Sequence, residues 1–129
     1  MKRTFLLLII ILAAISLAGC GTVQNNQTDF LQLIEVELTP PAQIKAGETV
    51  ALSTRVTQNG QPVEDAQEVR FEIGQVDSDE PKMIEGSGQK DGVYSIETKF
   101  EETGTYYIVA HVTARGVHSM PRKQFEVIP

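Results

Sequence analysis

The feature that most constrains this chain is an apolar period of two, which recurs in short runs from about residue 30 onward. In Val69-Arg-Phe-Glu-Ile73, apolar and charged residues alternate strictly, as in a β-strand with one buried face. Turn residues separate these runs at intervals of about ten residues. We expect strands within 31–38, 50–56, 69–73, 82–85, 93–100, 106–112 and 117–128. About seven short strands at this spacing predict an all-β, immunoglobulin-like β-sandwich.

The segment Glu102-Thr-Gly-Thr-Tyr106 supports this fold because it resembles the tyrosine corner that opens the sixth strand of such domains. We therefore expect Tyr106 to be buried, with its hydroxyl bonded to a nearby backbone carbonyl. Ile108 stands where antibody domains carry their second cysteine. Apolar packing must then hold the two sheets together in place of a disulfide.

The N-terminus predicts a secretory signal peptide over residues 1–19. Met1-Lys-Arg3 is a positive segment, residues 5–15 are apolar, and Leu17-Ala-Gly-Cys20 ends the run with small residues before a cysteine. The apolar run is too short for a membrane-spanning helix. Its end resembles the lipoprotein signal, which implies cleavage before Cys20 and a diacylglycerol thioether on its sulfur. The alternative is an ordinary secreted protein with a stray cysteine, although Cys20 is the only cysteine of the chain.

This leader sets the expected organisation and location of the chain. Residues 20–29 are polar and small after the lipidated cysteine, and we expect a flexible tether there. Residues 30–129 are enough for one domain. Lipid on Cys20 would anchor that domain to the cell membrane on its extracytoplasmic face.

The charge of the mature part argues against some partners. Of the 11 Lys and Arg residues, Lys2 and Arg3 belong to the leader, so nine basic side chains remain against 17 acidic ones, a net charge of about −8. Nucleic acid is therefore a poor partner. No nucleophile–base arrangement, phosphate-binding loop, dinucleotide glycine pattern or Cys/His zinc set is present in the sequence, so we do not expect an enzyme.

Four side chains are candidate metal ligands: His111, His118, Met120 and Met83. They are all the histidines and methionines that follow the leader, and three of them lie within ten positions. Imidazole together with thioether suits copper better than zinc, calcium or magnesium. The alternatives are that the histidines are merely solvated and that Met83, beside Ile84, belongs to the core. The acidic loop 77–80 lacks the spacing of a calcium loop, and we expect it to be solvated.

The turn at Arg115-Gly116 decides whether these ligands share a face. If Ile108, Ala110 and Val112 face the core, the alternate residues of the strand face outward; these are Tyr107, Val109, His111 and Thr113. A two-residue or four-residue turn pairs Thr113 with His118 and His111 with Met120, all on the outer face. A three-residue loop would put His118 and Met120 on the opposite face. Pro121 lacks a donor and indicates an edge or a bulge in the last strand.

Several motifs together resemble the YtkA-like (FixH-like) domain of bacterial lipoproteins. They are Asp91-Gly-Val-Tyr, Gly104-Thr-Tyr-Tyr, Ala110-His-Val-Thr-Ala-Arg-Gly and His118-Ser-Met-Pro. The resemblance covers nearly the whole mature domain and is most specific in its last forty residues. It implies an immunoglobulin-like extracytoplasmic domain connected with the assembly of respiratory oxidases.

The pair His118-x-Met120 is also similar to the end of the motif in PCuAC-type periplasmic copper chaperones. That resemblance implies one further Met and one further His. Met83 could supply the first, whereas His111 would have to replace the second from another strand, which departs from the motif. We therefore expect a lipid-anchored copper-binding protein, a metallochaperone whose partner is an oxidase subunit or another copper carrier. A metal-free interaction module and a copper storage or sensing lipoprotein are the alternatives.

Overall fold

The structure is a computed structural model that describes residues 32–88 and 90–129. The predicted signal peptide 1–19, the lipidation site Cys20 and the tether 20–29 lie outside the described residues. Residues 31–129 form one compact unit. Within the described ranges, no helix is long and apolar enough to cross a membrane.

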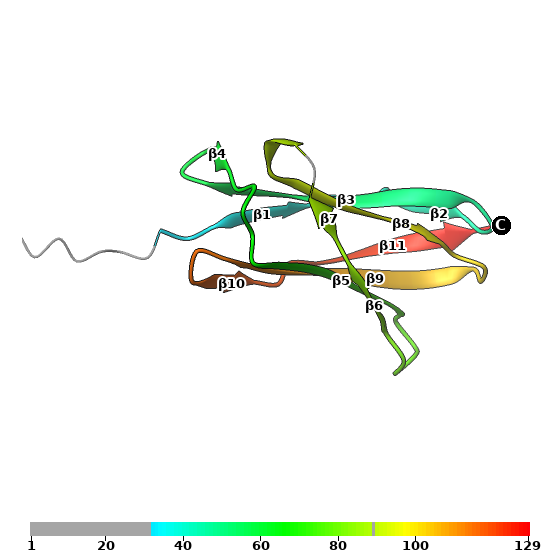
Figure 1. Cartoon of the computed structure of the whole chain (residues 1–129). Coiled ribbons are helices and arrows are strands. Elements are labelled where there is room, and N and C mark those ends of the chain that lie inside the picture. Colours follow the sequence, from blue (N-terminus) through cyan, green and yellow to red (C-terminus); the bar gives the residue numbers. More distant parts are fainter. Residues whose placement is uncertain (1–31, 89) are drawn as a thin grey trace, which may run out of the picture. The chain divides into compact units, whose positions relative to one another are not determined.

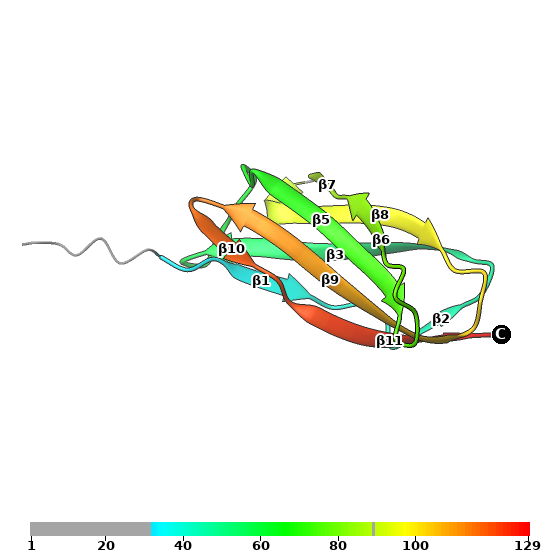
Figure 2. The same ribbon diagram turned by 90° about the horizontal axis from the view of Figure 1, so that it is seen from below.

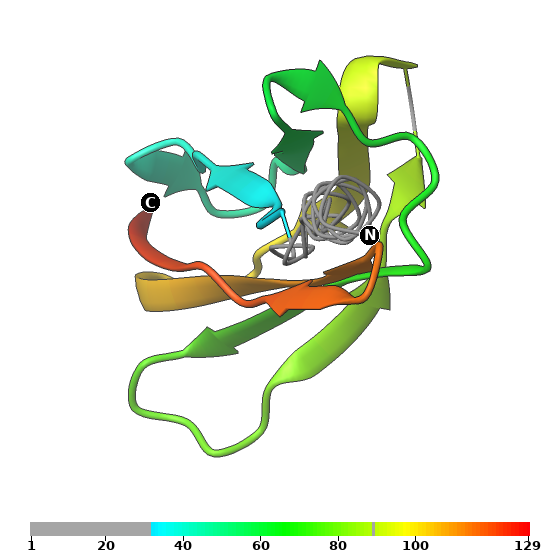
Figure 3. The ribbon, with the colours of Figure 1, turned by 90° about the vertical axis from the view of Figure 1, so that its left-hand side faces the viewer.

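Two sheets face each other as a sandwich, as predicted (Figure 1; end view in Figure 3). The first sheet has the order β1-β3-β8-β7, with β4 beside β3; its strands are β1 Glu35–Leu38, β3 Thr49–Gln58, β4 Gln61–Pro62, β7 Ser87–Gly88 and β8 Val93–Lys99. The second has the order β2-β11-β9-β5-β6, with β10 beside β9; its strands are β2 Gln43–Lys45, β5 Glu68–Gln75, β6 Lys82–Glu85, β9 Gly104–Ala114, β10 Val117–Ser119 and β11 Arg122–Ile128. A short 3₁₀ turn, η1 Lys90–Gly92, precedes β8.

The chain changes sheet several times along its length. β1 pairs antiparallel with β3, and after Pro40-Pro41 the chain crosses to the second sheet, where β2 runs parallel to β11. It crosses again between β6 and β7, which belong to different sheets (Figure 2). These crossings give each sheet strands from distant parts of the chain, as immunoglobulin-like folds do.

The core lies between the sheets and follows the predicted alternation. From β5, the inward residues Val69, Phe71 and Ile73 are buried, and β8 contributes Tyr94 and Ile96. Each such side chain stabilises the fold by about 1.5–3 kcal/mol through removal from water. Ile108, at the position expected for a cysteine in antibody domains, is fully buried in this cluster. Apolar packing thus fills the place of the disulfide.

The predicted tyrosine corner is present. The Tyr106 hydroxyl donates to the Glu102 carbonyl at 3.1 Å and accepts from Gln75 Nε2 at 3.0 Å. Its ring packs edge-on against Phe100 and stacks on Phe125, with centroids 4.9 and 5.9 Å away. The prediction of full burial is wrong, because Tyr106 is only half-buried at the end of the sandwich.

The expected first and last strands differ from the observed ones. Leu33 lies before β1 and is 74% exposed, so it adds nothing to the core. The last strand is divided into β10 and β11 at Met120-Pro121, since Pro121 has no N–H for the ladder. Its carbonyl still accepts the Ala110 N–H at 3.1 Å. Past the break, β11 lies between β9 and β2 and is not an edge strand.

Candidate functional site

The hairpin between β9 and β10 has the predicted two-residue turn. Arg115 and Gly116 have φ angles of 51° and 77°, and type I′ turns require positive φ at both central residues. The ladder pairs Val117 with Ala114 and His118 with Thr113, so the predicted register is confirmed. The Arg115 guanidinium also holds the turn in place by donating to Gln58 Oε1 at 2.8 Å and to Asp65 Oδ1 at 3.1 Å.

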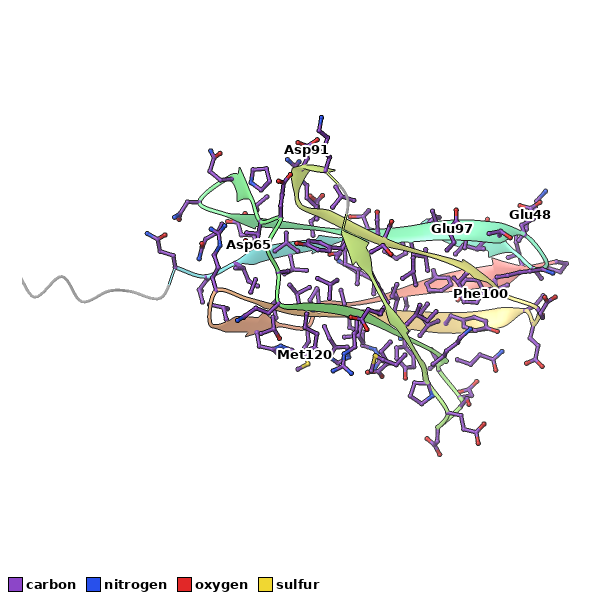
Figure 4. The ribbon with its side chains drawn as sticks, in the orientation of Figure 1. Glu48, Asp65, Asp91, Glu97, Phe100 and Met120 are labelled. Atoms are coloured by element: carbon purple, nitrogen blue, oxygen red, sulfur yellow. The ribbon has the colours of Figure 1, made fainter. Side chains whose placement is uncertain are left out.

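The same register continues across the break, which brings three candidate ligands to one face. Ser119 pairs with Val112 and Arg122 with Val109, so Met120 lies opposite His111. His111 and His118 have ring centroids 6.3 Å apart. Met120 is 56% exposed and lies on the side of the second sheet that faces away from the first (Figure 4).

His111 is held by a carboxylate that the sequence did not identify as part of the site. Its Nε2–H donates to Glu72 Oε2 at 2.9 Å, with side-chain exposures of 18% and 23%. Glu72 lies on β5, two residues after Arg70, which pairs with His111 in the ladder. The hydrogen bond from His111 is the main cause that lowers the pKa of Glu72 below its ordinary value of 4.5. Alternation in β5 had indicated that Glu72 faces outward, but not that β5 lies beside β9.

The other oxygen of Glu72 extends the network to Tyr107. The Tyr107 hydroxyl donates to Glu72 Oε1 at 3.1 Å, and the Arg122 guanidinium carbon lies 3.9 Å from the ring centroid. Burial, followed by the bond to Glu72, raises the pKa of Tyr107 above 10.0. Tyr107 is on the outer face as predicted yet only 8% exposed, because these neighbours cover it. Gly74 makes room: a Cβ there would lie 2.9 Å from the ring.

His118 is held through its Nδ1, whereas His111 is held through its Nε2. Thr113 Oγ1 lies 2.7 Å from His118 Nδ1 and donates its own proton toward Glu68 Oε2 at 3.5 Å. When Thr113 donates to Glu68, its oxygen accepts from Nδ1–H of His118, and in that tautomer the lone pair is on Nε2. Each imidazole thus has one nitrogen engaged by a neighbour, Nε2 in His111 and Nδ1 in His118.

Met83 is not brought to this group. It lies on β6 opposite Glu72 and is 46% exposed, so it is not a core residue. Two strands, β5 and β9, separate β6 from β10. Three strand spacings correspond to roughly 14 Å, which places Met83 away from His118 and Met120.

The His, Cys, Asp and Glu side chains of the described residues do not by themselves form a metal site. In residues 32–88 and 90–129, no group of three or more His, Cys, Asp or Glu side chains could hold a metal ion, and this includes the acidic loop 77–80. A metal at the β9–β10 hairpin would need the Met120 thioether as well as the two imidazoles. That donor set favours copper.

The solved structures that align with this chain are at most 21% identical to it in the three examples below, so the comparison concerns the fold alone. Trypsin-activated alpha-2-macroglobulin from Escherichia coli aligns with a TM-score of 0.52 at 19% identity, over 73% of this chain and 6% of that one. A putative glycoside hydrolase from Bacteroides vulgatus aligns with a TM-score of 0.48 at 21% identity, over 69% of this chain and 16% of that one. A superoxide reductase (neelaredoxin) from Ignicoccus hospitalis gives 0.47 at 16% identity, over 74% and 80% of the two chains.

Comparison of sequences identifies the family. No curated protein sequence matches this chain. The family model described as YtkA-like matches residues 28–111, well over half of the chain. The match covers the strands from β1 to most of β9 and ends at His111, so His118 and Met120 lie beyond it. The chain belongs to the YtkA-like family.

Proposed function

We propose that this YtkA-like protein binds copper through His111, His118 and Met120. The observation that carries the proposal is the register of the β9–β10 hairpin, which puts two imidazoles and a thioether on one outer face. Thioether sulfur favours Cu(I), and imidazole accepts either copper oxidation state. The proposal leaves Met83 out of the ligand set because of its distance.

The spacing of the two imidazoles suits a shared ion. With metal–nitrogen bonds of about 2 Å, a metal lies about 3 Å from each ring centre. Two such distances nearly span the 6.3 Å between the centroids of His111 and His118. In the described part of the chain, His111 Nδ1 and His118 Nε2 have no hydrogen-bond partner, so both can coordinate. Histidine ligands ordinarily donate their other N–H to a carboxylate or another acceptor, as Glu72 and Thr113 accept here.

We further propose that the protein is a copper carrier that delivers the ion to a respiratory oxidase while anchored to the membrane through lipid on Cys20. The exposed positions of His118 and Met120 support a carrier, since an acceptor's ligands can reach the ion directly. The oxidase as acceptor rests on the family resemblance and on the similarity of His118-Ser-Met120 to PCuAC-type chaperones.

Copper titration of residues 31–129 tests the site, because this unit is compact and contains no cysteine. We expect one Cu(I) per chain in competition with a chromophoric chelator. Met120→Ala should weaken Cu(I) preferentially, and His118→Ala should weaken both oxidation states. Met83→Ala is the matched control, an exposed methionine on the same sheet, and should leave the affinity unchanged. A wild-type domain that takes no copper from the chelator would refute the metal site and favour a metal-free interaction module.

Transfer kinetics separate a carrier from a storage or sensing protein. The copper-loaded domain is mixed with the copper-receiving domain of an oxidase subunit, and the metal content of each is followed after separation. A carrier should transfer faster than copper dissociates into chelator alone. Retention of the copper, or transfer limited by that dissociation, would argue for storage.

A further inference from the structure

A groove that shares no residue with the proposed copper ligands runs along β8, mainly between β8 and β6, and also reaches Ala51 of β3. It consists of two adjoining hollows of about 330 and 370 Å³, and Ile84 of β6 lines both. Eight consecutive positions of the chain, 95–102, line one or the other hollow. At about 3.3 Å per residue, the groove is about as long as an extended peptide of six to eight residues.

The backbone of β8 is incompletely paired along this groove. On one side β8 pairs with β3 over its whole length, from Val93 to Lys99. On the other side, β7 pairs with it only at Tyr94 and Ser95. Across the described strands, Ile96–Lys99 therefore has no ladder partner on the groove side. An unpaired strand edge is a template for an added strand.

The walls of the groove define the side chains that a strand there would carry. Its floor is apolar and includes Ile73, Ile84, Ile96 and Phe100, the last of which lies between the two sheets (Figure 4). An extended segment points alternate side chains to opposite sides. One set can therefore fill the two hollows while the other meets the rim.

The rim is acidic. Its charged residues are two lysines, Lys82 and Lys99, and five glutamates, Glu80, Glu85, Glu97, Glu101 and Glu102. Lys99 is already paired with Glu101 at 2.9 Å. A second copy of this chain would bring the same acidic rim and be repelled, whereas basic side chains would be attracted.

We propose that this groove binds an extended peptide segment with alternating apolar and basic residues, which adds to the first sheet as a strand along Ile96–Lys99. The segment continues the line of β7 and places its apolar side chains over Ile84 and Phe100. Its Lys or Arg side chains meet the glutamates of the rim. The partner is thus a protein with a basic, β-forming terminus or loop.

Chemical-shift mapping with synthetic peptides tests this, using ¹⁵N-labelled residues 31–129. The probe is a capped (Lys-Val)₄ peptide, compared with (Glu-Val)₄ and with a Lys/Val peptide that has proline at its central position. We expect the basic peptide to perturb residues 82–85 and 95–102 and to bind more weakly as salt rises. The acidic peptide should not bind, and the proline peptide should bind more weakly because it lacks a ladder donor.

Charge reversal supplies the matched variants. Glu97→Lys, on the groove edge of β8, should weaken the basic peptide by roughly threefold to tenfold, as for loss and reversal of one exposed ion pair. Glu35→Lys, on β1 at the opposite edge of the same sheet, should change the affinity little. The proposal is overturned if shifts scatter over all acidic surfaces, if both variants lose affinity equally, if the proline peptide binds as well as its parent, or if the basic peptide does not bind.

Discussion

Replacing Glu72 by Gln tests whether the carboxylate beside His111 acts on the proposed copper site. Glutamine has the same shape and keeps an oxygen that can accept the His111 Nε2–H, so the change removes mainly the charge. A hydrogen bond to a charged group contributes about 1.5–3 kcal/mol, against about 1 kcal/mol for a neutral one. Both side chains are less than a quarter exposed, so solvent screens the interaction only in part.

We therefore expect Glu72→Gln to weaken copper binding by about 1–2 kcal/mol, which corresponds to roughly fivefold to thirtyfold. Loss of comparable partners of metal-bound histidines typically costs 10–100-fold. Competition titrations measure the effect. Glu85→Gln is the control for charge alone, because Glu85 lies on β6 opposite Arg70 rather than beside a histidine. Equal losses in the two variants, or none in Glu72→Gln, would refute a role for this carboxylate.

The same substitution has a pH signature without metal. Because the pKa of folded Glu72 is lowered, its ionised form stabilises the fold above about pH 4.5, and this stability is lost as the pH falls through the lowered pKa. The difference in unfolding free energy between wild type and Glu72→Gln should be full at pH 6.5 and smaller at pH 3, below the ordinary carboxyl pKa of 4.5. Urea denaturation at both pH values measures it. A difference that is unchanged by acid would mean that the charge does not matter.

Three further predictions concern the fold and the anchor. Gly92→Ala should lower the free energy of unfolding by roughly 2–5 kcal/mol, because φ is +72° and a Cβ would lie 2.4 Å from the Val56 carbonyl oxygen. Gly60→Ala is the control: its φ is +74° but its surroundings are open, so it should cost only about 1–2 kcal/mol. Equal losses for the two variants in denaturant titrations would contradict this. Tyr106→Phe should cost about 1 kcal/mol through loss of the bond to Glu102, and a neutral result would show that the corner hydroxyl is dispensable. Cys20→Ala should release the protein from membranes or block its processing, and unchanged membrane fractionation would exclude the lipid anchor.

The strands of four or more residues could be predicted from the sequence, because runs of this length carry apolar residues between turn signals. Residues 69–73 and 82–85 lie in β5 and β6 as expected, and the latter range is identical to the observed strand. The two- and three-residue strands β2, β4 and β7 are too short for any period to show. β2 exists because tertiary contact places it beside β11, where the Ala46 N–H donates to the Ile128 carbonyl at 2.8 Å. Such pairing leaves no local signal.

Part of the candidate site could likewise be predicted from local sequence, and part of it depends on contacts between distant segments. The positions of His118 and Met120 relative to His111 followed from the turn at Arg115-Gly116, since a two-residue hairpin fixes the register over the next few pairs. Glu72 was missed because it is 39 residues from His111 in sequence. Only the pairing of β5 with β9 brings them together, and alternation within a strand does not reveal its neighbours.

Under the copper-carrier proposal, this division also assigns different tasks to the two histidines. His111 is the less exposed one, and Glu72, Tyr107 and Arg122 form a connected network beside it that keeps its ring in one orientation. His118 and Met120 are exposed at the hairpin, and the contact of His118 to Thr113 is a single bond within the same hairpin. An acceptor could therefore displace the exposed pair first while His111 still holds the ion. Such stepwise exchange allows a protein to bind copper firmly and still release it quickly to a partner.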